Sequence, residues 1–329
     1  MTPEELMRVA LAEAVLGRGR THPNPIVGAV VVKGSRIVAR GHHAAAGLPH
    51  AEVNALKAAG SKARGADLYV TLEPCNHHGR TPPCTESILA AGIARVFYGS
   101  RDPNPHVGGG GARKLQRSGL EVRQILGDEC DAANEMWFKF VTKGVPWVVL
   151  KAAITLDGKL ATAAGDSKWI SSEASRALVH QWRNELDAVL VGAGTARADN
   201  PLLTVRGVAG GRNPVRIVLG SLSPRARMRR EPGETLQLSG SLPKVLKQIA
   251  GRGLTSVLVE GGAQIHGAFL KEKLWDELRL FISPRIAGAD ALSWAGFKGP
   301  SKMRDALQAT LVDQQRIGED VLLRLRPEQ

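Results

Sequence analysis

The sequence has only three cysteines, few aromatic residues and no long apolar run, and each shortage argues against a class of protein. Aromatic residues make up 4% of the 329 residues, which disfavours a general single-strand nucleic-acid binder, because such proteins stack bases on aromatic side chains. No apolar stretch approaches the roughly 18 residues that a membrane-spanning helix needs. An odd cysteine count in a chain of this length disfavours a disulfide framework and favours metal binding or catalysis.

The charge distribution predicts where the protein works and what it binds. Acidic side chains stand near the start of the chain, where a secretory signal peptide would carry basic ones. We therefore expect a cytoplasmic protein without membrane contacts. The 44 basic residues outnumber the 31 acidic ones and give a formal net charge of +13. This excess favours anionic partners, which include nucleic acids, phosphorylated metabolites and nucleotide cofactors.

Length and pattern predict two α/β domains. A chain of this length typically forms about two domains, and predicted strands alternate with helices in both halves, which is typical of βαβ units. Turn residues at 143–146 precede a new apolar stretch at 147–154, so the predicted domains are 1–145 and 146–329. In the second half, Ser, Pro, Arg and Gly dominate residues 221–240, and we expect a loop there.

The most specific motif is a histidine, a glutamate and two cysteines in the first half. His50 and Glu52 precede a predicted helix, Cys75 follows a predicted strand, and Cys84 opens the next helix. One imidazole and two thiolates provide three ligands to a tetrahedral Zn²⁺ and leave the fourth position open to water, as in catalytic sites. Glu52 is placed to move protons without binding the metal, which is the chemistry of hydrolytic deamination.

Other interpretations of these residues remain at this point. Zinc deaminases are described by H-x-E followed by P-C-x-x-C, whereas here the second cysteine stands nine positions after the first. The intervening stretch contains His77 and His78, which are rival ligands, and a purely structural zinc site is the alternative function. Cys130 has no partner nearby in the sequence and is interpreted as a packing residue.

The second half contains two glycine-bearing turns after predicted strands. Residues 192–195 read Gly-Ala-Gly-Thr, and Gly261 and Gly262 precede a predicted helix. Glycines at such positions let backbone N–H groups approach a pyrophosphate. Each turn is a weak signal, and without a complete G-x-G-x-x-G pattern a Rossmann fold is not supported.

Several segments resemble one enzyme family over essentially the whole chain. TLEPCNHHGRTPPC at 71–84, THPNPIVGAVVV at 21–32, TLDG at 155–158, SKWI at 167–170 and VEGG at 259–262 resemble the bifunctional riboflavin-biosynthesis deaminase/reductase family. The resemblance implies a cytidine-deaminase-like α/β/α sandwich followed by a domain similar to dihydrofolate reductase. It also implies zinc-dependent deamination of a diamino-hydroxy-phosphoribosylaminopyrimidine, and then NADPH-dependent reduction of its ribosyl side chain to ribityl.

The resemblance also implies roles for individual residues. In the first domain, it implies that Asn24, His43, His77 and Arg80 hold the pyrimidine and its phosphate. In the second domain, the residues implied for NADPH are Ile154, Trp169, Thr195, Asp199, Ser221, Gly261 and Gly262. Those implied for the substrate are Ser167, Arg183, Leu203, Arg206 and Glu260. Without the resemblance, Trp169 would be interpreted as a core aromatic residue and Arg183 as a solvated helix residue.

The sequence departs from the family pattern in the second half. Asn200 stands where an acid is usual, Gly220 stands where an acid is common, and the connection after Ser221 is shorter than in longer members. Four arginines at 225, 227, 229 and 230 are candidates for the 2′-phosphate of the cofactor or for a solvated surface. The sequence names no proton donor for the reduction.

Three functional hypotheses follow. The first is the bifunctional enzyme, which we expect to be a homo-oligomer, dimeric or tetrameric, that acts on a phosphorylated pyrimidine and not on nucleic acid. The second is a nucleic-acid deaminase or RNA-binding protein that uses the same zinc chemistry on a flipped base, but it would not need the second half. The third is a deaminase fused to an inactive reductase.

Overall fold

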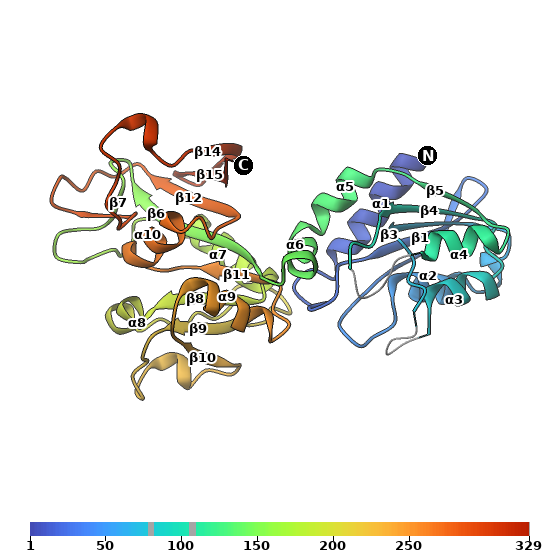
Figure 1. The fold of residues 1–329 in the computed structure, drawn as a ribbon, viewed down its shortest axis with the longest axis horizontal. Helices are drawn as coiled ribbons and strands as arrows, with labels where there is room; N and C mark the ends of the chain where they lie inside the picture. Colours follow the sequence, from blue (N-terminus) through green and yellow to red (C-terminus); the bar gives the residue numbers. More distant parts are fainter. Residues whose placement is uncertain (78–81, 105–109, 329) are drawn as a thin grey trace. The chain divides into compact units, whose positions relative to one another are not determined.

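The computed structural model describes residues 1–77, 82–104 and 110–328. The chain divides into two compact units, Met1–Val145 and Pro146–Gln329 (Figure 1). Each unit contains one main β-sheet with helices packed against it, and the α/β class expected from the sequence is confirmed. None of the helices in the described part of the chain has the length and apolar character needed to cross a membrane.

The first unit is built on a five-stranded sheet in the order β2-β1-β3-β4-β5. Strand β1 pairs antiparallel with β2 and with β3, whereas β3, β4 and β5 are parallel. The strands are β1 (Gly28–Lys33), β2 (Arg36–His42), β3 (Asp67–Leu72), β4 (Arg95–Ser100) and β5 (Glu121–Gln124). The helices are α1 (Pro3–Val15), α2 (Ala51–Ala59), α3 (Cys84–Ala90), α4 (Gly111–Arg117), α5 (Gly127–Ala133) and α6 (Glu135–Lys143), with a 3₁₀ turn at Gly60–Ala63.

Apolar layers cover both faces of this sheet. Val30 and Val31 of β1 point to opposite faces because side chains alternate along a strand. Helices α2, α3 and α4 pack over the Val31 face, and α1 and α5 pack over the Val30 face (Figure 1). Cys130 on α5 is fully buried in the second layer, as predicted. The result is an α/β/α sandwich.

The second unit contains an eight-stranded sheet in the order β10-β9-β8-β11-β6-β12-β15-β14. The six strands from β10 to β12 are parallel, and β15 and β14 are antiparallel to their neighbours. The strands are β6 (Trp147–Thr155), β8 (Ala188–Gly192), β9 (Val215–Leu219), β10 (Thr235–Leu238), β11 (Ser256–Val259), β12 (Glu277–Ser283), β14 (Ala309–Ile317) and β15 (Asp320–Pro327), and β7 (Lys159–Ala161) pairs separately with β13 (Leu292–Ser293). The helices are α7 (Glu173–Glu185), α8 (Ala193–Asp199), α9 (Leu242–Ala250) and α10 (Ala263–Lys271), with 3₁₀ turns at Arg227–Arg229 and Met303–Asp305.

The expectation that residues 221–240 form a loop is wrong in part. The segment contains the 3₁₀ turn Arg227–Arg229 and strand β10, which pairs in parallel with β9. Met228 is fully buried in an apolar cluster with residues of β8 and β9. The fully buried guanidinium of Arg216 donates to the carbonyls of residues 231–233 and to the Thr235 hydroxyl. These long-range contacts order a segment whose composition alone is typical of a loop.

At the amino ends of β8 and β11, Asp187 ties the two strands together. One carboxylate oxygen of Asp187 accepts hydrogen bonds of 2.7 Å from both the backbone N–H and the hydroxyl of Thr255. The backbone N–H of Asp187 donates to the Ser256 hydroxyl at 3.0 Å. Asp187 is buried, so its partners have no access to bulk water. These hydrogen bonds join the amino ends of β8 and β11 and fix the register between the two strands.

We expect Asp187→Ala to lower the free energy of unfolding by roughly 2 to 4 kcal/mol, because it leaves the buried Thr255 donors unpaired. The measurement is the urea concentration at the unfolding midpoint of the second unit, taken from unfolding of the whole chain. Asp305→Ala is the control, because the Asp305 side chain is 55% exposed and its loss is expected to change stability by less than about 0.5 kcal/mol. Equal midpoint shifts in the two variants would contradict the assigned role.

Candidate active sites

Three predicted ligands converge in the first unit. Nδ1 of His50 lies 3.1 Å from Sγ of Cys84 and 3.5 Å from Sγ of Cys75. The three ligand atoms all lie within 4.8 Å of one another. In tetrahedral zinc sites, sulfur and nitrogen ligands bind at about 2.3 and 2.0 Å and therefore lie roughly 3.5 Å apart. The side chains thus fit a zinc ion without rearrangement.

Element ends place each of these ligands. His50 is the residue before α2, Cys75 follows β3, and Cys84 is the first residue of α3. The backbone N–H of Cys84 donates to Sγ of Cys75 at 3.3 Å, which holds the two cysteines side by side. Gly111 at the start of α4 approaches the Pro74 carbonyl so closely that a Cβ would lie 1.8 Å from that oxygen. The bare glycine therefore lets α4 pack against the backbone that carries Cys75.

The electrostatics of the cysteine pair favour metal binding. A hydrogen bond from Cys84, together with one from His50, lowers the pKa of Cys75 to about 4. The same hydrogen bond and burial raise the pKa of Cys84, so the metal-free pair retains one proton between its two sulfurs. Metal binding releases such a proton because thiolates are the ligands.

Glu52 lies beside the three ligands without belonging to them. It stands in the first turn of α2 and is only 4% exposed. Burial, helped by the negative charge of Cys75, raises the pKa of the Glu52 carboxyl. A carboxyl group whose two protonation states are close in free energy suits proton transfer. The geometry therefore agrees with the role that the sequence predicts for it.

The structure brings two of the residues implied for the pyrimidine next to the ligands. The ring of His43 meets that of His50 edge to face, with centroids 5.5 Å apart. Nδ1 of His43 lies 3.2 Å from the Pro49 carbonyl, which can only accept, and Nε2 lies 3.1 Å from Nδ2 of Asn24, which can only donate. These partners select the neutral tautomer of His43, and burial lowers its pKa.

Of the other two residues implied for this site, His77 and Arg80, only His77 lies within the described residues. His77 is exposed and does not belong to the group of potential metal ligands found among the described residues. Its role as a rival zinc ligand is therefore not supported. His78, the other rival ligand, and Arg80 lie outside the described residues.

In the second unit, a cavity of about 990 Å³ lies at the carboxyl ends of β6, β8 and β11. Such strand ends are the usual ligand-binding edge of parallel sheets. The predicted site residues that line it are Ser167, Trp169, Arg183, Thr195, Asp199, Leu203, Arg206, Glu260, Gly261 and Gly262. Ile154 is buried within β6 and Ser221 is exposed after β9, and neither lines the cavity. Of the four arginines at 225–230, Arg227 lines it.

A buried ion pair anchors one wall of this cavity. Arg183 donates to both carboxylate oxygens of Glu260, at 2.6 and 2.8 Å, and to the Thr204 carbonyl at 3.2 Å. Burial opposes both charges, but the charge of Arg183 holds the pKa of Glu260 below its usual range, and Glu260 raises the pKa of Arg183. The interpretation of Arg183 as a solvated helix residue is therefore wrong.

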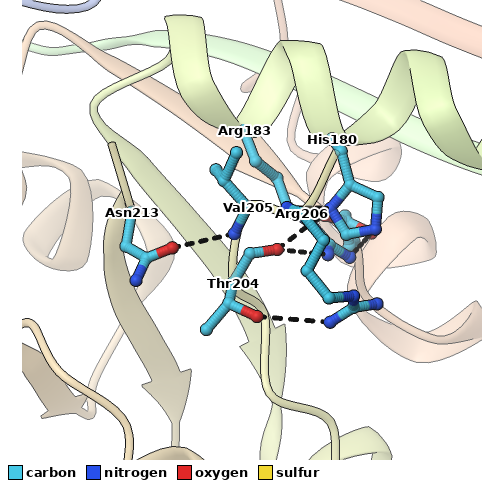
Figure 2. A network of polar contacts seen from close by, with 7 residues as sticks. His180, Arg183, Thr204, Val205, Arg206 and Asn213 are labelled. Carbon is cyan, nitrogen blue, oxygen red and sulfur yellow. Dashed lines mark hydrogen bonds and ion pairs between the residues drawn. The ribbon is translucent and has the colours of Figure 1, made fainter. Parts of the chain in front are cut away.

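Thr204 lies within hydrogen-bond distance of side chains from two segments, as Figure 2 shows. Besides Arg183, its carbonyl lies 3.0 Å from Nδ1 of His180, and its hydroxyl accepts from Nη1 of Arg206 at 3.2 Å. The neighbouring Val205 N–H donates to Oδ1 of Asn213 at 2.8 Å (Figure 2). Helix α7 and the segment after α8 are thus joined around a group of cationic side chains.

At the mouth of the cavity, Trp169 is 61% exposed, so its interpretation as a core aromatic residue is wrong. The guanidinium of Arg176 stacks over its indole, 4.6 Å from the ring centroid. Contact with a guanidinium holds an indole in place by a cation–π interaction. Trp169 is therefore a positioned aromatic surface beside the cavity.

The two glycine-bearing turns lie next to each other at the cavity. A Cβ on Gly262 would lie 3.2 Å from Oγ1 of Thr195. His266 on α10 lines the same cavity, yet among the described residues neither of its ring nitrogens has a hydrogen-bond partner. Burial lowers the pKa of His266 to about 4.

Lys151 also lines this cavity and is absent from the site residues predicted from the sequence. It stands in the middle of β6, an otherwise apolar strand, and burial lowers the pKa of its amine. Nζ lies 5.8 Å from the ring centroid of Phe281. A lysine within a buried apolar strand is costly unless it is paired or functional. A charged residue within an otherwise apolar strand is therefore the sequence feature that could have identified Lys151 as a candidate site residue.

Comparisons with known proteins agree with this division of sites. Residues 1–100 match the family described as the cytidine and deoxycytidylate deaminase zinc-binding region, and residues 146–323 match the RibD C-terminal domain. The riboflavin biosynthesis protein RibD of Bacillus amyloliquefaciens is 42% identical, over 98% of this chain and 96% of that protein. RibD of Escherichia coli is 39% identical over 99% of both chains.

Solved structures agree as well. The crystal structure of a diaminohydroxyphosphoribosylaminopyrimidine deaminase/5-amino-6-(5-phosphoribosylamino)uracil reductase from Thermotoga maritima is 40% identical, with a TM-score of 0.92 over 99% of both chains. RibD of Acinetobacter baumannii is 35% identical, with a TM-score of 0.93 over 99% of both chains. Both halves of the expected fold are therefore confirmed.

We expect Cys75→Ser and Cys84→Ser to lose bound metal, because each removes one of three protein ligands. The measurement is zinc per chain by atomic absorption after dialysis, with about one zinc in the parent protein and near zero in each variant. Cys130→Ala is the matched control, because Cys130 is buried in the α1 and α5 layer and its loss should leave the zinc content unchanged. Full zinc in either serine variant would show that the ligands are wrongly assigned.

Proposed function

The chain belongs to the RibD family of bifunctional riboflavin-biosynthesis enzymes, and from this premise we propose that unit 1–145 carries the deaminase site and unit 146–329 the reductase site. The activities are zinc-dependent hydrolytic deamination and NADPH-dependent reduction. The observation that carries the assignment is the convergence of His50, Cys75 and Cys84 beside the buried Glu52. The second unit contributes the cavity with its glycine turns and cationic wall.

The first reaction is deamination of 2,5-diamino-6-(5-phosphoribosylamino)pyrimidin-4(3H)-one. A zinc ion held by the three ligands would supply Lewis-acid activation of water for attack on the amino-bearing ring carbon. The Glu52 carboxylate takes a proton from the attacking water and delivers it to the leaving amino nitrogen, which departs as ammonia. The enclosed position of Glu52 keeps bulk water away from this transfer.

Side chains around the ligands hold the pyrimidine. Asn24 and His43 lie beside His50 and form a hydrogen-bonded pair, which fixes the orientation of the Asn24 amide. The remaining polar atoms of that amide are suited to the pyrimidine's own donors and acceptors. We assign His77 and Arg80 to the phosphate end of the same substrate.

The second reaction reduces the ribosyl group to ribityl with NADPH. We assign Trp169, Thr195, Asp199, Gly261 and Gly262 to the cofactor, together with Ile154 and Ser221. Ser167, Arg183, Leu203, Arg206 and Glu260 are assigned to the substrate. Because Arg183 is committed to Glu260, we assign the phosphate to Arg206, whose side chain donates to the Thr204 hydroxyl and keeps further donors for an anion.

Lys151 is the proton donor that the sequence did not reveal. Reduction adds a hydride to the ribosyl carbon and a proton to the oxygen released from it. Lys151 lines the cavity, and burial lowers the pKa of its amine, which makes the ammonium a stronger acid than in water. A buried lysine of this kind suits general acid catalysis.

We place the enzyme in the cytoplasm and propose that it forms a homo-oligomer. All three cysteines are free, as expected where thiols are kept reduced. Strand β14 lies at the edge of its sheet and exposes Leu311 and Val312, each about half accessible. Exposed apolar edge strands are usually covered by another chain, and a second copy pairing along β14 would cover this one.

The direct test incubates the zinc-loaded protein with the diaminopyrimidine ribosyl phosphate and measures ammonia, and then adds NADPH and follows its absorbance. Ammonia release followed by NADPH consumption supports both assignments. Ammonia without NADPH consumption would support the hypothesis of an inactive reductase. Absence of both signals would contradict the proposed substrate.

Glu52→Gln should retain zinc but lose deamination by at least about a hundredfold, because the ligands remain while the proton carrier does not. Zinc content and ammonia release measure the two effects separately. Glu86→Gln is the control, because Glu86 lies on α3 and is no part of the metal group. Ammonia release at the parent rate by Glu52→Gln would refute this mechanism.

Lys151→Met should lower NADPH oxidation by roughly a hundredfold or more, because it removes the proton donor and keeps the packing volume. Single-turnover NADPH absorbance with the deaminated substrate is the measurement, and ammonia release in the first unit should stay unchanged. Lys168→Met, which alters another cavity lysine, should have a smaller effect. Equal rates in the two variants would exclude Lys151 as the donor.

A further inference from the structure

His180 occupies a position in the cavity wall that the assignments above leave without a role. It stands on α7, lines the cavity, and lies between Arg183 on its own helix and Arg206 on the segment after α8 (Figure 2). Its Nδ1 lies 3.0 Å from the Thr204 carbonyl and 3.3 Å from the backbone N–H of Arg206. Among the described residues, Nε2 has no hydrogen-bond partner.

The two neighbours of Nδ1 make opposite demands on the ring. The Thr204 carbonyl can only accept, so it needs a proton on Nδ1, whereas the Arg206 N–H can only donate, so it needs a bare Nδ1. A neutral imidazole satisfies one of them at a time. An anion in the cavity is a further acceptor, and only the protonated imidazole can donate to the Thr204 carbonyl from Nδ1 and to an anion from Nε2 simultaneously.

The surroundings of His180 disfavour the protonated ring. Burial first, and then the charges of Arg183 and Arg206, lower the pKa of His180, while the Thr204 carbonyl and the more distant Glu260 act in the opposite direction. A phosphate dianion between His180 and Arg206 would offset the repulsion from the two arginines and favour the charged ring. The same cavity is also lined by further titratable and charged groups, which are Lys151, Lys168, Arg176, Arg227, His266 and Asp199.

We propose that His180 is a further ligand of the substrate's phosphate, beside Arg206, and that phosphate binding to the reductase cavity is coupled to uptake of a proton by His180. This inference rests on the proposed assignment of that cavity to the phosphorylated substrate. Phosphate binding that favours the protonated ring of His180 becomes tighter as the pH falls. This effect of falling pH ends where the phosphate itself takes up a proton, with a pKa of about 6.

The test is isothermal titration of the whole zinc-loaded protein with ribose 5-phosphate at about pH 7.5, where the phosphate is mainly a dianion. Runs in buffers of different ionisation enthalpy give the number of protons taken up. We expect a measurable fraction of a proton for the parent protein and a clearly smaller uptake for His180→Asn, whose amide can still donate to the Thr204 carbonyl but cannot titrate. Affinity should fall about tenfold in the variant, and the difference should shrink at about pH 9.

The controls distinguish failure of this inference from failure of the proposed assignment of the cavity to the phosphorylated substrate. Ribose without phosphate should cause no uptake, and retained NADPH binding by His180→Asn shows that the second unit is folded. If Arg206→Ala leaves ribose 5-phosphate binding unchanged, the cavity assignment fails and the inference with it. If Arg206→Ala weakens binding but the parent and His180→Asn take up equal protons, only the inference is overturned. His180→Gln, or the imidazole resonance of His180 in the parent protein, decides the matter if the asparagine variant does not fold.

Discussion

The central parallel strands of both sheets are buried on both faces, and this constraint decides where chemistry can occur. Strands β3, β4, β8 and β11 read as almost continuous apolar runs, as is typical of strands covered by helices on both sides. Such strands leave little room for polar side chains along their length, and the polar groups of the two sites lie mostly at strand ends, with Lys151 within β6 as an exception. In the first unit Cys75 follows β3, and in the second Glu260 follows β11, so the metal ligands and the cavity wall both lie at carboxyl ends.

This constraint also explains which parts of the sites could be predicted from sequence. The zinc ligands were predictable because each stands at the end of an element with a recognisable local pattern, and because His50, Cys75 and Cys84 form a set that few other functions require. The pairing of Arg183 with Glu260 was not predictable, because 77 residues separate them and only the packing of α7 against β11 brings them together. Periodicity carries no information about such contacts.

Segment 221–240 illustrates the same limit for the fold. Its composition is typical of a loop, yet the burial of Met228 and the hydrogen bonds of Arg216 order it. Two departures from the family pattern gain a physical explanation in this region. Asn200 has a φ of +42° and accepts the Arg227 N–H, and Gly220 has a φ of +99°. Asparagine tolerates positive φ better than most residues, and glycine tolerates it without strain, so both are compatible with an intact cavity.

The two units solve the problem of buried charge in different ways. In the first, burial and the negative charge of Cys75 raise the pKa of the Glu52 carboxyl, so a carboxyl group that moves protons is kept away from bulk water. In the second, Glu260 is neutralised by Arg183 and held ionised, which leaves Arg206 and Lys151 as cations without a committed carboxylate. Basic side chains outnumber acidic ones among the described residues that line the cavity, and a phosphorylated ligand would offset this excess of positive charge. The excess of basic residues in the sequence is thus explained, at this wall, by a small anionic substrate, without any need for nucleic acid.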